Sequence, residues 1–92
     1  MLFFWGSNKK IVSEREFRDV RSRLRSRGLS GDEVDKVGMI FRADIDEPES
    51  MQRGIDEQEI ERGIKWMREN TRIHRLSQSR IDIIDEELRK RL

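Results

Sequence analysis

Apolar residues recur every three or four positions in four stretches of this sequence, with polar or charged residues between them. The apolar positions are Phe17, Val20 and Leu24; Val34, Val37 and Phe41; Ile60, Ile64 and Met67; and Ile81, Ile84, Leu88 and Leu92. Because a helix turns once in about 3.6 residues, this spacing places each set on one side of a helix. The pattern predicts an all-α fold with helices near residues 14–27, 31–42, 57–70 and 77–91. No stretch shows the regular alternation of a strand.

Each predicted helix begins with the same local signal: an apolar residue, a capping residue, and a second apolar residue four positions after the cap. The caps, with the Glu three residues later where one is present, are Ser13 with Glu16, Ser30 with Glu33, Asp56 with Glu59, and Ser77 alone. A cap of this kind with its Glu predicts a capping box, in which side chain and backbone exchange two hydrogen bonds. The four starts support a compact four-helix module.

Three glycines have interpretable positions in this pattern. Gly28 follows the first predicted helix and suits the left-handed residue that often ends a helix. Gly38 and Gly63 lie on or beside the apolar stripes, where a missing side chain can let two helices approach closely. Glycine in a helix interior costs about 1 kcal/mol. The alternative is that the fold simply tolerates both residues.

The connection between the second and third predicted helices, residues 43–56, is the longest and the most acidic. Long loops in compact domains are usually functional or disordered. The flanking stretches, LSGDEVDKVGMIF and GIDEQEIERGI, resemble the incoming and outgoing helices of an EF-hand over about residues 29–70. The resemblance implies an EF-hand-like helix-loop-helix with a divergent, expanded loop at the centre of the module.

The resemblance also implies the ligands of a calcium site. Asp44 and Asp46 match the first and third loop positions, Asp56 the ninth, and Glu59 the closing bidentate Glu. The loop then spans residues 44–59, longer than the family's loop of about twelve residues. A second interpretation needs no metal, because Asp56 and Glu59 already form a cap and its box, and the helix dipole favours acidic residues there.

The net charge of +1 conceals an uneven distribution along the chain. Residues 1–27 carry a net charge of +5, residues 28–61 carry −8, and residues 62–92 carry +4. The arginines of the first predicted helix flank its apolar stripe, as in a helix that packs by the stripe and extends long side chains into water. The acidic middle and the lack of a recognised binding motif argue against nucleic acid as a partner.

The N-terminal segment contains an aromatic cluster followed by a lysine pair. The residues of interest are Leu2, Phe3, Phe4, Trp5, Lys9 and Lys10. The apolar run is far shorter than the roughly 20 residues of a membrane-spanning helix. Two interpretations remain: the aromatic residues complete the core, or the segment contacts an anionic membrane surface or a protein partner.

With 92 residues, the chain has the length of one small helical domain, in which residues 1–12 form a flexible or anchoring segment. Charged residues make up 42% and apolar residues 34%, so a core depends on the regular spacing of the apolar positions. The lack of cysteine excludes disulfides, thiolate metal sites and a Cys nucleophile. It favours a cytoplasmic location, peripheral to the membrane if the N-terminal segment anchors there.

No pattern in the chain is typical of catalysis. There is no Gly-rich phosphate loop, and His74, in a basic connection, is expected to be solvated. The sequence predicts a non-enzymatic binding or adaptor module that presents an apolar surface to a protein or membrane partner and requires no cofactor. The alternative is a calcium-binding module that uses the acidic loop 44–59.

Overall fold

Four helices of two and a half turns or more form the body of the molecule. They are α1 (Glu14–Ser26), α2 (Gly31–Ile40), α4 (Glu57–Glu69) and α6 (Gln78–Arg89). Two single-turn helices, α3 (Arg42–Ile45) and α5 (Thr71–His74), lie in the connections. The computed structural model describes residues 11–46 and 54–92. The prediction of four helices in a mainly helical module is confirmed, with each end within three residues of its expected place.

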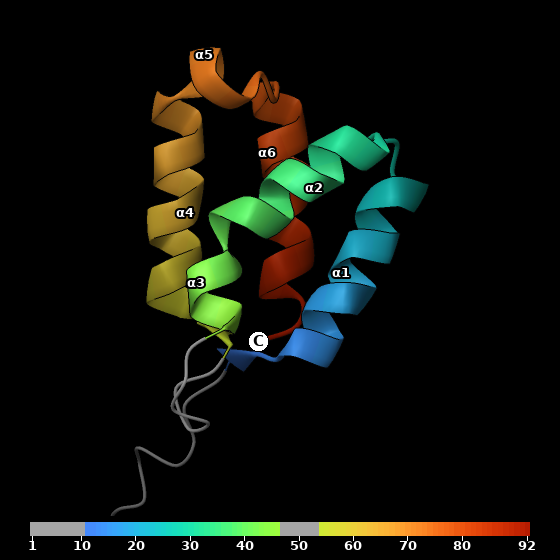
Figure 1. Ribbon diagram of the computed structural model, residues 1–92, viewed down its shortest axis with the longest axis vertical. Coiled ribbons are helices and arrows are strands. Elements are labelled where there is room, and N and C mark those ends of the chain that lie inside the picture. Colours follow the sequence, from blue (N-terminus) through green and yellow to red (C-terminus); the bar gives the residue numbers. More distant parts are fainter. Residues whose placement is uncertain (1–10, 47–53) are drawn as a thin grey trace, which may run out of the picture.

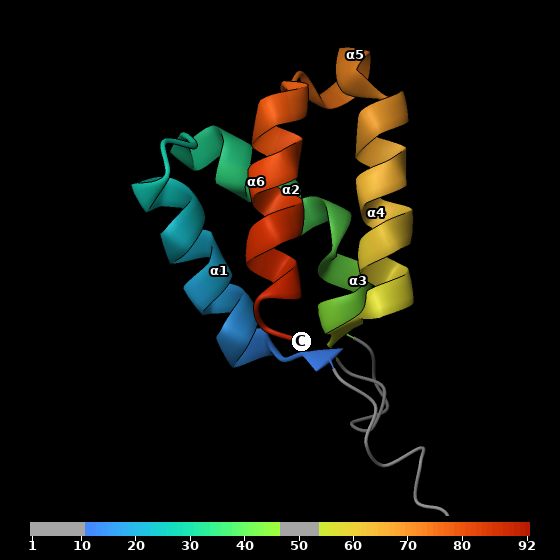
Figure 2. The ribbon, with the colours of Figure 1, turned by 180° about the vertical axis from the view of Figure 1, so that it is seen from behind.

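Helix α6 occupies the middle of the arrangement. It lies between α1 and α4, and α2 crosses it on one face (Figure 1). The opposite view shows α6 in front, flanked by α1 and α4 (Figure 2). The apolar stripes of all four helices meet in one core, as the spacing predicts. Every stripe residue is buried except Leu92, which packs against the core while partly exposed.

The four helix starts have the predicted caps. The side-chain oxygens of Ser13, Ser30, Asp56 and Ser77 each accept a hydrogen bond from the backbone N–H three residues later. At the first three, the Glu side chain accepts the N–H of the capping residue in return, which completes the box. Gly28 has the expected positive φ, 104°. Local sequence therefore determines where these helices begin.

A short antiparallel pairing joins the segments that lead into α1 and α4. Strand β1 (Ile11–Val12) pairs with β2 (Ile55–Asp56), with Ile11 opposite Asp56 and Val12 opposite Ile55. Gly54, at φ 118°, precedes β2, and a Cβ there would lie 2.8 Å from the Val12 carbonyl oxygen. The pairing is too short to show alternation, so the sequence pattern alone does not reveal it. It brings the starts of two capped helices side by side.

His74 is buried, so the expectation of a solvated side chain is wrong. Its Nε2–H donates to the Met67 carbonyl oxygen at 2.6 Å, and its Nδ1 accepts the Leu76 N–H at 2.9 Å. Both ring nitrogens therefore have partners across the turn between α4 and α6. Arg75, in the left-handed conformation with φ 62°, makes that turn. His74 is a structural residue of the connection.

A buried carboxylate ties the end of α1 to α6. Glu87 is 1% exposed, and its Oε2 accepts hydrogen bonds from Arg27 Nη1 at 2.9 Å and Lys90 Nζ at 3.4 Å. Burial acts to raise the pKa of Glu87, but the hydrogen bonds from Arg27 and Lys90, with the charges of Lys90 and Arg23, lower it overall. The carboxylate is thus held charged inside the fold. Nothing in the periodic pattern distinguished Glu87 from its exposed neighbours.

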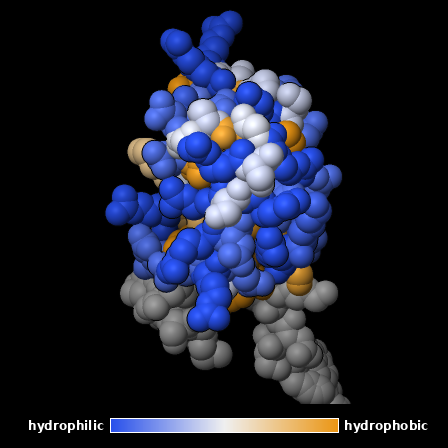
Figure 3. Space-filling model, turned by 90° about the vertical axis from the view of Figure 1, so that its right-hand side faces the viewer, coloured by the Kyte–Doolittle hydropathy of each residue, from blue (hydrophilic) through white to orange (hydrophobic). Residues whose placement is uncertain are grey.

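The outer face of α1 is strongly hydrophilic. In Figure 3, which views the molecule from the α1 side, blue side chains cover most of the surface and apolar atoms are scattered. Arg15, Arg18, Arg23 and Arg25 are exposed, as predicted for arginines that flank a buried stripe. No helix within residues 11–46 and 54–92 combines the length and the apolar character that a membrane crossing requires.

Candidate functional site

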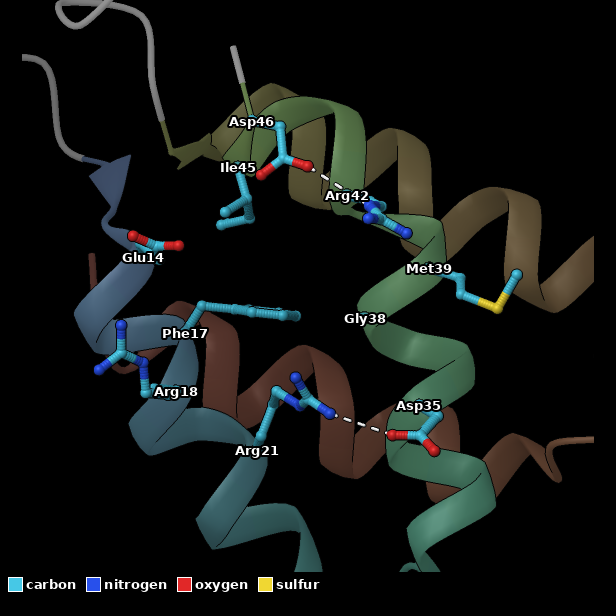
Figure 4. Close-up of a pocket in the computed structure, with 10 residues that line it drawn as sticks. All are labelled: Glu14, Phe17, Arg18, Arg21, Asp35, Gly38, Met39, Arg42, Ile45 and Asp46. Carbon is cyan, nitrogen blue, oxygen red and sulfur yellow. Dashed lines mark hydrogen bonds and ion pairs between the residues drawn. The ribbon is translucent and has the colours of Figure 1, made fainter.

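A cleft lies on each side of α2. The first, of about 410 Å³, lies between α1, α2 and α3 and has Phe17 and Ile45 on its apolar wall (Figure 4). Its charged rim is internally balanced: Arg21 donates to Asp35 at 3.0 Å, and Arg42 pairs with Asp46 at 3.4 Å. Among the residues that the structure describes, three basic and three acidic side chains line this cleft. It therefore offers little net charge to a ligand.

The second cleft, which we call the α2–α4 groove, differs in charge and in its walls. It measures about 370 Å³ and is lined by Ile40, Phe41, Asp44, Glu59, Arg62, Gly63 and Trp66. Apolar side chains form its floor and one end. Among residues 11–46 and 54–92, two carboxyl groups and one guanidinium line the other end. This combination of apolar surface and unbalanced acidic charge makes the groove the better candidate site.

Gly63 creates the floor of the groove. The Phe41 ring lies so close to the α4 backbone that a Cβ at position 63 would be 2.5 Å from two of its carbon atoms. Phe41 is 1% exposed and meets Phe17 edge to face, with ring centroids 6.3 Å apart. The predicted close approach is therefore confirmed at Gly63. At Gly38 it is absent, because the nearest atom to a Cβ there is Arg21 Cζ at 3.9 Å.

Trp66 forms the apolar wall of the groove. The residue is 40% exposed, although it is one of the largest apolar residues in the described part of the chain. Its ring contacts the buried His74 ring at a centroid distance of 5.8 Å, and its carbonyl oxygen accepts a hydrogen bond from Asn70 Nδ2 at 2.8 Å. The contact with His74 thus holds the indole on one side, while another part of its surface is exposed to solvent.

Two carboxyl groups meet at the opposite end of the groove. Partial burial raises the pKa of Asp44 to about 7, assisted by a hydrogen bond with Glu59 and by the charges of Glu59 and Asp56. Arg62 acts in the opposite direction and lowers it. Glu59 is oriented by the capping box, where it accepts the Asp56 N–H at 2.9 Å. Asp44 therefore holds a proton that it releases near neutral pH.

The structure separates the four residues predicted as calcium ligands. Asp44, Asp56 and Glu59 lie near one another at the start of α4. Asp46 faces the other cleft and pairs with Arg42. The reason is α3: successive helical residues turn by about 100°, so positions 44 and 46 point to opposite sides. Across residues 11–46 and 54–92, no three His, Cys, Asp or Glu side chains are arranged to hold a metal ion.

The N-terminal contact residues of the sequence analysis fall outside the described part of the chain. They are Leu2, Phe3, Phe4, Trp5, Lys9 and Lys10. The core and anchor interpretations of that segment both stay predictions.

Sequence reasoning missed the groove residues Ile40, Arg62 and Trp66. A signal for Trp66 exists in the spacing of α4: Glu59, Gly63 and Trp66 follow one another at four and three residues, parallel to the buried stripe. Such a second line on a helix marks a face next to the core. This line is a weak signal in the sequence because only one of its three residues, Trp66, is a large apolar residue.

Comparisons of the chain with protein-family models, with curated proteins and with solved structures give no significant match.

Proposed function

We propose that this protein is a small non-enzymatic binding module that presents the α2–α4 groove to a protein partner. The observation that carries the proposal is the half-exposed Trp66 beside the apolar floor made by Ile40, Phe41 and Gly63. Large apolar surface left in water is costly, and contiguous patches commonly mark interaction sites. Tryptophan is also among the residues that contribute most to binding energy at protein interfaces.

The rigidity of the groove supports this proposal. The Trp66 ring lies tilted against buried His74, whose two ring nitrogens are both hydrogen-bonded, and Phe41 is fixed between Phe17 and Gly63. A preformed apolar site loses less conformational entropy on binding than one that must first become ordered. The groove therefore has the properties of a docking site for a partner side chain.

A photoreactive residue in place of Trp66 tests the proposal. In the full chain, p-benzoylphenylalanine at position 66 is expected to crosslink to one discrete protein in cells, whereas the same residue at position 73 is not. Ile73 is the matched control because it is 69% exposed and apolar but lies on α5, outside the groove.

Binding of the purified captured protein must then depend on the groove. Trp66→Ala is expected to weaken its binding at least about tenfold, as for a hot-spot residue, and Ile73→Ala by about twofold or less. Helical content and melting curves of both variants establish that they fold. Equal losses from the two variants, or capture from position 73 alone, would contradict the proposal.

We also propose that the segment from α2 to α4 is an EF-hand-like helix-loop-helix. Two observations support it. The pairing of β1 with β2 lies directly before α4, at Ile55, where paired EF-hand loops form their short contact. Each strand runs into a helix that starts with the same box, Ser13 with Glu16 and Asp56 with Glu59. The incoming and outgoing helices α2 and α4 would then be the walls of the groove.

Calcium binding at the start of α4 is a second candidate function. It is favoured by one observation, the proximity of the Asp44 and Glu59 carboxyl groups, which a divalent cation would bridge once Asp44 has released its proton. Calcium prefers carboxylate and carbonyl oxygens. Glu59 is also the residue that the EF-hand resemblance assigns to the closing bidentate position.

Calcium titration of the full chain, after removal of metal with EDTA, tests this candidate. A cation that binds only the folded state is expected to raise the melting temperature. Asp44→Asn should abolish the rise, because it removes one of the two carboxylates. Glu57→Gln should retain it, since Glu57 is exposed and faces Arg89 at 3.5 Å instead. No shift of the wild-type melting temperature in millimolar calcium would exclude the candidate.

A further inference from the structure

The α2–α4 groove is apolar at one end and acidic at the other, and this asymmetry restricts its partner. We propose that its occupant is a basic amphipathic helix of a partner protein, with an apolar side chain at Trp66 and a lysine or arginine at Asp44 and Glu59. The inference rests on the proposed binding function and specifies the chemistry of the partner.

The charges lining the groove favour a cation over an anion. Asp44 from α3 and Glu59 from α4 approach each other, and among the described residues of the lining Arg62 from α4 is the single basic side chain. The neighbouring cleft between α1 and α2 provides the contrast, because two of its arginines already pair with its two aspartates. A cationic side chain between Asp44 and Glu59 would pair with both carboxyl groups and would favour the ionised form of Asp44.

The spacing along α4 determines the spacing in the partner. Glu59 and Trp66 are separated by seven residues, which is two helical turns or about 10 Å along the axis. Gly63 lies between them, and because it has no side chain, the floor of the groove is not raised at this point. A partner helix that lies along the groove would therefore place its basic residue about seven positions from its apolar anchor, on the same face. A small or apolar residue would lie over Gly63.

Both ends of the groove are held in place before binding. Glu59 is fixed by the capping box at the start of α4, with hydrogen bonds of 2.9 Å and 2.8 Å to and from Asp56. Trp66 rests against His74. The distance between the acidic and the apolar end is thus a property of α4 itself, which favours recognition of a regular helical partner.

Three synthetic helical peptides of equal length test the inference on the full, isotope-labelled chain. The first carries Leu and Lys seven residues apart on one face, the second has Glu in place of that Lys, and the third has Ala in place of that Leu. Binding is followed by NMR shifts of groove residues. At low salt, the Leu/Lys peptide is expected to bind at least about tenfold more tightly than the Leu/Glu peptide. The Ala/Lys peptide should also bind more weakly, because it lacks the apolar anchor.

Two substitutions at acidic positions show which carboxyl group causes the charge effect. Asp44→Asn should reduce the preference for Lys over Glu at least about threefold, because it removes one carboxyl of the pair. Asp46→Asn is the matched control: it lies two residues away but faces the other cleft, so the preference should be unchanged. Added salt should weaken the binding of the Leu/Lys peptide more than the binding of the Leu/Glu peptide.

The outcomes separate this inference from the function on which it rests. Binding in the groove with no preference between Lys and Glu would overturn the inference and leave the binding function intact. Failure of every peptide to shift the resonances of Ile40, Gly63 and Trp66 would overturn both. Concentration-dependent shifts of the same residues without peptide would overturn the inference in favour of a second copy of this chain. Loss of the Lys preference in Asp46→Asn as well would also overturn it.

Discussion

Replacement of Gly63 by alanine is expected to destabilise the protein by about 1 to 3 kcal/mol, the usual cost of forcing extra volume into a packed core. The added Cβ would lie 2.5 Å from two atoms of the Phe41 ring. The ring has little room to retreat, because it is 1% exposed and packed against Phe17. Alanine alone would favour the helix by up to about 1 kcal/mol. The clash outweighs that gain.

Gly38→Ala is the matched control for this prediction. Gly38 is also a helical glycine, but the nearest neighbour of its added Cβ is Arg21 Cζ at 3.9 Å, an ordinary contact. Its replacement is expected to stabilise the protein by about 0.5 to 1 kcal/mol through helix propensity. Chemical denaturation followed by circular dichroism measures both variants. Phe41→Leu replaces the ring by a smaller aliphatic side chain and should recover part of the stability lost in Gly63→Ala. If Gly63→Ala and Gly38→Ala changed the stability in the same direction, the packing of Phe41 against Gly63 would be contradicted.

Asp44→Asn is expected to stabilise the protein by about 1 to 2 kcal/mol at pH 8 and to have little effect at pH 4. The folded state raises the pKa of Asp44 from 3.8 to about 7. Between these values the unfolded chain has released the proton while the folded chain retains it, so stability falls as pH rises through this window. Above pH 7 the loss is complete. Solvent near this partly exposed carboxyl screens the effect, which is why the expected value is modest.

Denaturation of wild type and variant at several pH values, in EDTA, measures this difference directly. Asparagine has the shape of the protonated acid but cannot ionise, so the gain should grow from pH 4 to pH 8. Asp46→Asn serves as the control, because its exposed pair with Arg42 should contribute about 0.5 kcal/mol or less at any pH. A gain from Asp44→Asn that is equal at both ends of the range would contradict the acidic pair.

The helices could be predicted because their determinants are local. A cap such as Ser13 or Ser30 bonds a backbone group three residues away, and a stripe such as Ile60, Ile64 and Met67 is visible within one helix. These signals depend on spacing alone. The close approach at Gly63 could also be anticipated. The pattern did not distinguish Gly63 from Gly38, because the neighbours of each glycine come from another part of the chain.

The features that escaped prediction depend on contacts between distant segments. His74 looks like a polar residue in a basic turn, and its burial becomes visible only when the turn brings it against Met67 and Trp66 of α4. Glu87 is buried because Arg27, sixty residues earlier, reaches its carboxylate. The interpretation of residues 44 and 46 as neighbouring loop ligands failed to anticipate α3, which directs them to opposite clefts. The groove combines residues from α2, α3 and α4, so no single stretch announces it.

The central position of α6 has a consequence for how the fold is acquired. Helices α1 and α4 both lie against α6, which is the last helix of the described chain (Figure 2). During synthesis, the earlier helices therefore emerge without the surface that covers them. Isolated helices of about 13 residues are marginal in water. The core can close only after α6 has left the ribosome, so folding is expected to be a single late event in which all four helices become ordered together.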